Sequence, residues 1–317
     1  MMLAAAGLAA GLLILIAAGE PLQAAPGDKG KIAFASDRAG NMDIWVMNAD
    51  GTNPVQLTND PLPEVFPTFS PDGNKIAFAR GERAGAEIHV MNANGTGQTQ
   101  LTSNAMGDAQ PAWSPDGTQI AFLRVEQPTL DREIYVMNAN GSGERDLTND
   151  PPPADPADFP PFDIEPAWSP DGTQIAFSSD RSSESPEPCL AVYTMSPNGT
   201  DIRKLTADSM EAFSPAWSPE GDKLAFSDHA CTGESDLFVM NPDGTGVRQL
   251  FETRANETGA TWSPDGKKIA FDRFKLTSVG IVPGTGEIYV VGENGKSLQN
   301  LTKYPGADDE HPDWSPK

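Results

Sequence analysis

The sequence is poor in cysteine, histidine and basic residues. Its 317 residues include two cysteines and three histidines, and 45 Asp and Glu outnumber 22 Lys and Arg. The net charge of -23 argues against a protein that holds nucleic acid by its phosphates. A G-x-S-x-G nucleophile motif, a P-loop and a paired-glycine dinucleotide motif are absent from the sequence. We therefore expect no catalytic residues, no enzyme activity and no cofactor.

Glycine and proline, by contrast, are plentiful, with 30 and 29 residues, which indicates a turn-rich β protein. The first 19 residues carry no charge, and the apolar stretch 12–18 precedes small residues and Pro26. This pattern predicts a secretory signal peptide, residues 1–24, followed by a short linker, residues 25–30. The alternative is an uncleaved signal anchor of about 18 apolar residues. Either places the remainder in the periplasm or outside the cell.

A unit with the pattern P-x-[WF]-S-P-[DE]-G-x-x-[IL]-A-F dominates the rest of the chain. It occupies residues 67–78, 111–122, 166–177, 215–226 and, with Ala260 in place of proline, 260–271. A sixth opening at 312–316 lacks its continuation, which is present at 31–34. The serines of the six units are 44 to 55 residues apart, a period typical of a four-stranded propeller blade.

Each repeat contains four strand-like pieces, of which the first ends in Trp-Ser and the second is Ile-Ala-Phe. The third resembles Asp43–Met47 and ends in an Asn-x-x-Gly turn, and the fourth ends in Leu-Thr. The sequence thus predicts an all-β fold, a six-bladed β-propeller over residues 31–317. We expect the C-terminal strand to pair inside the first blade, which removes exposed sheet edges.

These motifs resemble the TolB-type propeller repeat. The resemblance rests on Trp-Ser-Pro-Asp-Gly-x-x-Ile-Ala-Phe followed by Asp/Glu-Ile-Tyr-Val-Met-Asn-x-x-Gly and covers residues 31–317. It implies an exported bacterial propeller, here without the α/β domain that TolB, a periplasmic protein of the Tol-Pal envelope system, carries ahead of its propeller. No binding residue is implied by the resemblance.

Acidic residues precede the innermost strand of every predicted blade, and we call this set the acidic ring. Its members are Glu64, Asp108, Asp163, Glu211, Glu257 and Asp309. Such a ring could capture Ca²⁺ or a cationic ligand through hard oxygen donors. Alternatively, Arg80, Arg124 and Arg273 should lie beside these acids, so ion pairs would staple the blades instead.

A second acidic set begins the third strands on the same face of the propeller. Its members are Asp43, Glu87, Glu133, Asp236 and Glu287.

The histidines and cysteines have separate roles in this interpretation. His89 takes a place that is aromatic in the other third strands, which favours packing. His311 precedes Pro312 at the predicted channel mouth and is a rim candidate, whereas His229 is either a loop residue or a rim contact. Cys189 and Cys231 fall in loops of adjacent blades, and an even cysteine count in an exported chain predicts a disulfide. The alternative is two free buried thiols.

The function expected from these features is that of a non-enzymatic protein- or ligand-binding scaffold in the cell envelope. We expect a monomer whose partner, an envelope protein or a small ligand, binds the face with the acidic loops and the Pro- and Asp-rich segment 150–166. We expect no binding to nucleic acid, and none to a membrane beyond the signal segment. The alternative is a propeller enzyme, a hydrolase or lyase, acting on a carbohydrate or peptide at the channel mouth.

Overall fold

The computed structural model describes residues 30–82, 85–126, 130–150, 160–181, 189–229, 234–277 and 280–316. The predicted signal peptide, Cys231 and most of the segment 150–166 lie outside these residues. The disulfide to Cys189 therefore stays a prediction. Among the described residues, no helix is long and apolar enough to cross a membrane.

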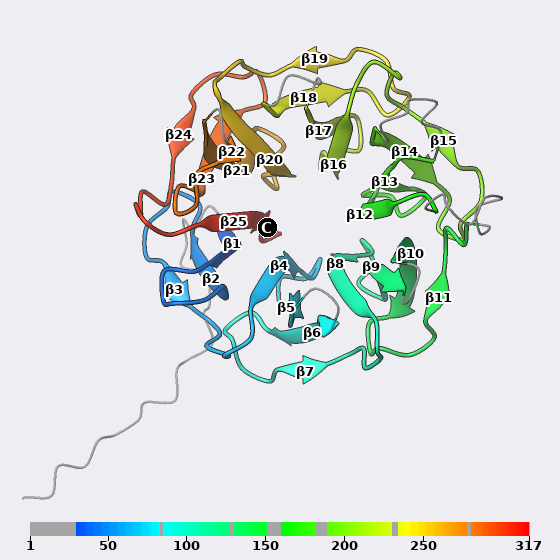
Figure 1. The fold of residues 1–317 in the computed structure, drawn as a ribbon, viewed down its shortest axis with the longest axis horizontal. Coiled ribbons are helices and arrows are strands. Elements are labelled where there is room, and N and C mark those ends of the chain that lie inside the picture. Colours follow the sequence, from blue (N-terminus) through cyan, green and yellow to red (C-terminus); the bar gives the residue numbers. More distant parts are fainter. Residues whose placement is uncertain are drawn as a thin grey trace, which may run out of the picture.

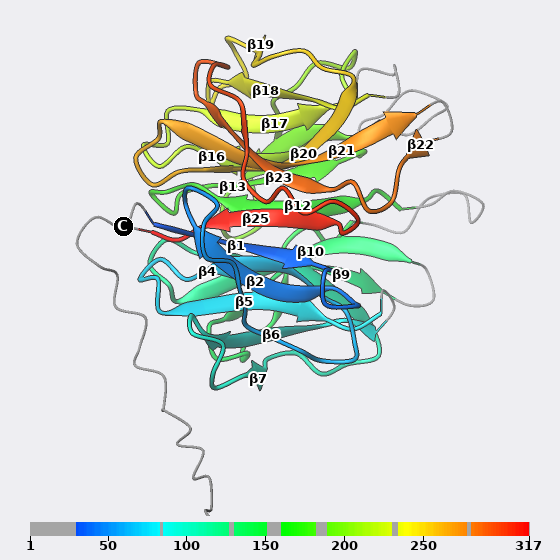
Figure 2. The same ribbon diagram turned by 90° about the vertical axis from the view of Figure 1, so that its left-hand side faces the viewer.

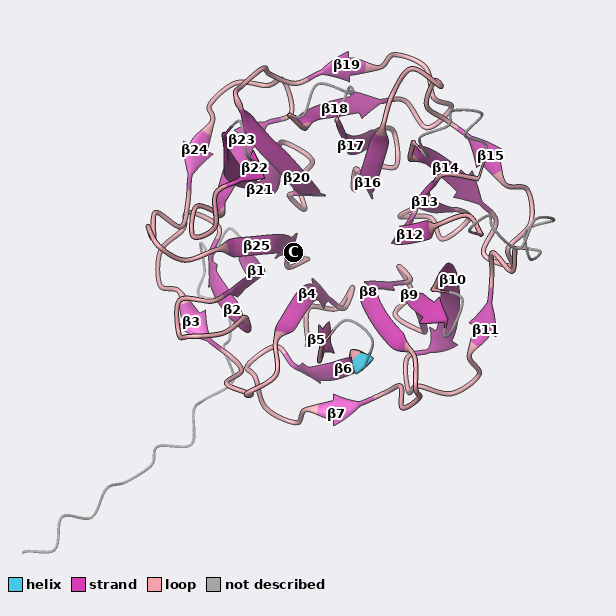
Figure 3. Cartoon of the chain, viewed as in Figure 1, coloured by secondary structure: helices cyan, strands magenta, loops and turns pink. Residues whose placement is uncertain are grey.

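Six antiparallel sheets stand around a central axis as the blades of a propeller (Figures 1 and 3). This arrangement confirms the six-bladed all-β prediction. We number the blades 1 to 6 from the one that contains Lys31. The innermost strands, in that order, are β25 (Asp309–Trp314), β4 (Glu64–Phe69), β8 (Gly107–Trp113), β12 (Asp163–Trp168), β16 (Ala212–Trp217) and β20 (Ala255–Trp262).

The remaining strands follow outward in the same blade order. The second strands are β1 (Lys31–Ser36), β5 (Lys75–Arg80), β9 (Gln119–Glu126), β13 (Ile175–Ser179), β17 (Leu224–Asp228) and β21 (Lys268–Thr277). The third strands are β2 (Asp43–Asn48), β6 (Glu87–Asn92), β10 (Asp131–Asn138), β14 (Ala191–Met195), β18 (Asp236–Met240) and β23 (Glu287–Gly292). The short outer strands are β3 (Val55–Gln56), β7 (Thr99–Gln100), β11 (Arg145–Asp146), β15 (Arg203–Lys204), β19 (Arg248–Gln249) and β24 (Gln299–Asn300). Blade 6 has one further strand, β22 (Gly280–Ile281), which pairs with β21 and which the repeat pattern did not predict.

The ring closes by pairing between the two ends of the described chain. β25 lies antiparallel to β1, with Trp314 opposite Ile32 and Asp309 opposite Ser36. The two strands run side by side in both views (Figures 1 and 2). The Lys31 N–H donates to Ser315 Oγ at 2.8 Å, and the Ser315 N–H returns a bond to the Lys31 carbonyl. The predicted closure is confirmed.

The core of each blade is built around the phenylalanine of Ile-Ala-Phe. All six of these rings are fully buried, because each sheet is covered on both faces by its neighbours. In blade 2 the Phe78 ring stacks on His89 at 5.7 Å, where blade 3 has Phe122 and Tyr135 at 5.9 Å. His89 is 8% exposed, and burial lowers its pKa to about 4. The prediction that His89 is a packing residue is confirmed.

The Asn-x-x-Gly turns pack against the end of the preceding blade. Gly141, at φ +83°, lies so close to the end of blade 2 that a Cβ there would meet the Leu101 carbonyl oxygen at 2.6 Å. In blade 1, Gly51 approaches Leu301 of blade 6 in the same way, at 2.5 Å. Glycine is required at these turns both for the positive φ and for the close approach.

Gly141→Ala should therefore destabilise the propeller by about 1–3 kcal/mol, since the backbone strain of a non-glycine residue is added to a clash. Urea unfolding of the two proteins measures this loss. Gly306→Ala is the matched control, because Gly306 has φ +94° but open space around its Cβ position. Equal losses in the two variants would show that the contact with Leu101 contributes nothing.

Candidate functional site

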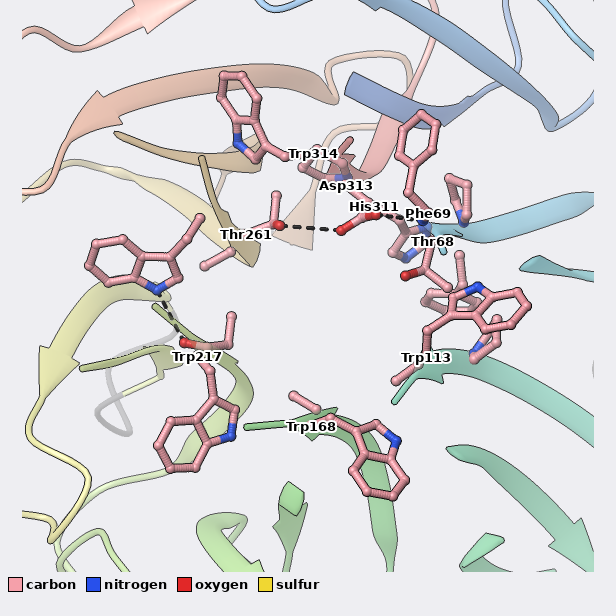
Figure 4. A pocket seen from close by; sticks show the side chains of 18 of the residues that line it. Thr68, Phe69, Trp113, Trp168, Trp217, Thr261, His311, Asp313 and Trp314 are labelled. Carbon is pink, nitrogen blue, oxygen red and sulfur yellow. Dashed lines mark hydrogen bonds between the residues drawn. The ribbon is translucent and has the colours of Figure 1, made fainter. Parts of the chain in front are cut away.

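A cavity of about 620 Å³ occupies the centre of the ring and is walled by all six innermost strands. Figure 4 shows that tryptophans from several blades surround it. Its aromatic lining consists of Phe66, Phe69, Trp113, Trp168, Trp217, Trp262 and Trp314. Prolines of the Ser-Pro turns, among them Pro71 and Pro316, continue the wall to one face of the propeller. The channel wall is therefore largely apolar and aromatic.

One residue of each innermost strand bulges into this wall, and we call the six the bulge ring. The pairing with the second strand shifts register at this point in every blade. All six residues have φ between +52° and +64°, and five are not glycine, so the backbone is strained around the ring. The bulge ring consists of Phe66, Gln110, Glu165, Ser214, Gly259 and His311.

Side chains of the bulge ring are bonded to one another around the channel. Gln110 Oε1 accepts the N–H of Glu165 at 3.0 Å. Glu165 in turn accepts the Ser214 N–H and hydroxyl, both at 2.7 Å. On the opposite side, the His311 ring lies 3.9 Å from the Phe66 ring. The strained backbone N–H groups of Glu165 and Ser214 are thus each bonded to a side chain of the preceding blade. These bonds hold this part of the wall in place without a ligand.

The titratable side chains of the described channel wall are two carboxyl groups and one histidine. Asp313 accepts the Phe69 N–H at 2.7 Å and lies 3.4 Å from the Thr261 hydroxyl (Figure 4). Burial raises the pKa of Asp313 to about 7 and lowers that of His311 to about 4, so at pH 7 the histidine is neutral and Asp313 is about half ionised. Glu165 adds a second carboxyl group, and the described lining contains neither Lys nor Arg. The tryptophan rings pack into the hydrophobic clusters between the blades, so the carboxyl groups and the Phe66 ring are the features of the channel that suit an organic cation.

The acidic ring lies away from this cavity, and none of its members lines the channel. The side chains of five members are fully buried and ion-paired. The pairs are Arg38–Asp309, Arg80–Glu64, Arg124–Asp108, Arg181–Asp163 and Arg273–Glu257. The expected contacts of Arg80, Arg124 and Arg273 are present, whereas Arg38 and Arg181, four residues after the phenylalanine, were not anticipated. At Glu257 burial outweighs the arginine and raises the pKa to about 7.

Blade 5 departs from this pattern. Ala212 takes the buried position of the acid, and the side chain of Glu211, 32% exposed, pairs with His229 Nδ1 at 3.3 Å. His229 is thus in contact with the acidic ring, and Glu211 is the member whose described partner is a histidine instead of an arginine. The rim candidate His311 belongs to the bulge ring inside the channel.

Carboxylates of the second acidic set accept hydrogen bonds from threonines that follow the outer strand of the same blade. Thr102 and Thr302 donate their hydroxyls to Glu87 and Glu287 at 2.6 Å, and Thr148 does the same to Glu133. The Thr102 hydroxyl also accepts the Ile88 N–H at 2.9 Å. The threonine of each Leu-Thr ending thus has a structural role that the sequence analysis missed.

A family profile described as the TolB beta propeller domain matches residues 23–127, 63–148, 111–214 and 201–317. The chain belongs to the TolB β-propeller family. Together the matches include every blade of the structure, as the repeat pattern predicted. A search of curated proteins finds no match.

Solved structures agree with the TolB-type fold. TolB from Acinetobacter baumannii superposes with a TM-score of 0.74 and 21% identity, over 92% of this chain and 68% of that one. A putative TolB from Agrobacterium tumefaciens gives 0.68 and 15%, over 91% and 99% of the two chains. An oligogalacturonate lyase from Vibrio parahaemolyticus gives 0.56 and 14%, over 86% and 74%. At these identities the likeness concerns the fold alone.

The carboxyl groups near the channel should make this TolB-type propeller lose stability as pH rises from 4 to 7. Burial raises the pKa of Asp272 to about 7, from 3.8 in the unfolded chain. The folded state therefore keeps a proton that the unfolded state has lost, and its stabilising effect disappears as pH passes 7. Asp272→Asn should flatten the dependence of unfolding free energy on pH in this window.

Asp171→Asn is the control for this prediction. A bond from the Ser169 hydroxyl lowers the pKa of Asp171, so that group titrates below the window. Denaturant unfolding at pH 4, 5, 6 and 7 measures the slopes. The prediction is wrong if Asp272→Asn and Asp171→Asn give the same slope as the wild type.

Proposed function

We propose that this protein is a non-enzymatic binding module of the cell envelope whose central channel holds a cationic ligand. The ligand is a short, positively charged segment of an envelope protein or a small organic cation. The observation that carries the proposal is the channel wall, which contains the carboxyl groups of Asp313 and Glu165 and, among its described residues, neither Lys nor Arg. Export is supported by the uncharged N-terminal stretch and by membership of the TolB family.

Two kinds of interaction favour binding of a cation in the channel. The ammonium or guanidinium group of the ligand is attracted to an aromatic ring within about 6 Å, and the Phe66 ring of the bulge ring lines the channel. The carboxylates add charge complementarity, and the net charge of -23 steers cations toward the protein from a distance. Because the bulge ring is fixed by its own hydrogen bonds, little ordering of the wall is needed on binding.

The bonding of the polar wall residues supports binding over catalysis. Asp313 and Glu165 already accept backbone N–H groups, which orients them as fixed acceptors. His311 Nδ1 is 3.8 Å from Glu310 Oε2, beyond the range of an oriented acid–base pair. The propeller-enzyme alternative would require turnover of an oligosaccharide or peptide, and such turnover, lost in Asp313→Asn, would overturn the non-enzymatic part of the proposal.

Titration with trilysine, followed by tryptophan fluorescence, tests the proposal. Wild-type protein should show a saturable change that weakens as salt approaches 1 M, where the Debye length is about 3 Å. Asp313→Asn and Glu165→Gln should each weaken binding by about tenfold. Trialanine amide is the ligand control, and Glu293→Gln, at an exposed surface pair with Lys223, is the protein control. Equal affinity of trilysine for the wild type and both channel variants would contradict the proposal.

A further inference from the structure

A second cavity, of about 420 Å³, lies on the opposite face from the Ser-Pro turns, between blades 5 and 6. Blade 5 contributes Glu211, Phe213 and His229, and blade 6 contributes Asn256 and Phe274. Ile281 of β22, the additional strand of blade 6, also lines the cavity, and so does Leu190, which directly precedes β14 of blade 4. Figure 2 shows β22 beside the far end of β21, away from the C-terminus. The cavity therefore exists where two departures from the repeat meet.

The first departure is the missing acid–arginine pair of blade 5. In blade 3, Asp108 and Arg124 are opposite each other in the strand register, and both guanidinium bonds to the carboxylate are 2.7 Å long. At the equivalent register position of blade 5, Ala212 faces Asp228. An apolar residue replaces the acid and an acid replaces the arginine. In blades 1 and 4 this register position is Ser36 and Ser179, and the arginine follows two residues later. The sequence of blade 5 has Asp228 and Ala230 at these two positions, so it has an arginine at neither.

The cavity wall supplies a carboxylate and aromatic rings, the groups that bind a guanidinium. Glu211 offers a half-exposed carboxylate at the cavity wall, and its described ion pair, with His229, uses Oε2. Phe213 and Phe274 supply aromatic walls for the stem and for the planar group of the ligand. Blade 3 shows that a guanidinium at this end of the propeller can lie against an aromatic ring, since the Arg124 guanidinium carbon is 4.5 Å from the centre of the Tyr135 ring.

We infer that this cavity binds a small alkylguanidinium compound, with its planar group on Glu211 and its apolar stem between Phe213 and Phe274. A carboxylate and a guanidinium form paired hydrogen bonds of matching geometry, which an ammonium or a neutral urea does not reproduce. The volume is within the range that small-molecule sites occupy, about 300–1,000 Å³. This site goes beyond the proposed channel function and does not depend on it.

Isothermal titration with n-butylguanidinium tests the inference, and N-butylurea serves as the neutral ligand of the same shape. Butylguanidinium should bind the wild type at least about tenfold more tightly than butylurea. Glu211→Gln should remove this preference, and the half-exposed position of Glu211 makes the variant compatible with folding. Glu82→Gln is the control, because Glu82 is an exposed acid between the second and third strands of blade 2 and does not line the cavity. Affinity unchanged by Glu211→Gln, equal binding of the two ligands or no binding of butylguanidinium would each overturn the inference.

Discussion

Deletion of residues 307–317 is expected to prevent formation of a stable propeller. The deletion removes β25, which pairs with β1 and also packs against β4, β20 and β21. It takes away the buried Trp314 side chain, and the loss of a buried tryptophan alone costs about 3–5 kcal/mol. It also leaves Arg38 without Asp309, its buried partner at 2.6 Å. Because native domains are stable by about 5–15 kcal/mol, the summed loss should leave little folded protein.

Near-ultraviolet circular dichroism and a thermal melt measure this effect. Trp314→Ala is the graded control, which should keep the fold at a lower melting temperature because the backbone pairing with β1 remains. A deletion variant with the melting temperature of the wild type would show that the ring does not need closure by β25.

Arg124→Met should destabilise the protein by about 3–5 kcal/mol, the largest loss expected from a single substitution of a charged residue. The Asp108 side chain is fully buried, and Arg124 supplies two of its hydrogen bonds while also binding Glu144 at 2.7 Å. Methionine keeps much of the stem but leaves the carboxylate buried without its cation. Urea unfolding of the variant against the wild type measures the loss.

Two further variants isolate the buried charge as the cause. Asp108→Leu/Arg124→Met removes both charges and should lose less than Arg124→Met alone. Lys204→Met breaks an exposed pair with Asp208 and should cost about 0–1 kcal/mol. If Arg124→Met costs no more than Lys204→Met, the acid–arginine pairs do not staple the blades.

The blades and their closure could be predicted because local chemistry repeats. Ser-Pro-Asp-Gly specifies a turn through its proline and glycine, and the structure shows Ser70 and Asp72 bonded across it at 2.6 Å. The continuation of the motif at 31–34 identified the partner of the C-terminal strand, and the register of β1 with β25 agrees. The fifth strand of blade 6 has no counterpart in the described parts of the other blades, so the repeat pattern did not predict it.

The channel site could be predicted only in part. His311 was singled out, but the bulge ring was missed, because residues before a proline favour extended backbone and five of these six precede one. Their positive φ accompanies the shift in register between the innermost and second strands, which depends on strand pairing and not on the sequence pattern of one strand. The acidic ring was a clear pattern in the sequence, yet only the fold shows that five of its members face arginines rather than the channel.

Hydrogen-exchange mass spectrometry with and without trilysine tests most directly whether the channel is the binding site. We predict slower exchange in the innermost strands on ligand addition, strongest in segments 64–69 and 309–314, which carry Phe66, His311 and Asp313. The outer strands should exchange at unchanged rates. Protection confined to the outer strands or to the face with the acidic loops, or no protection at saturating trilysine, would contradict a ligand site in the channel.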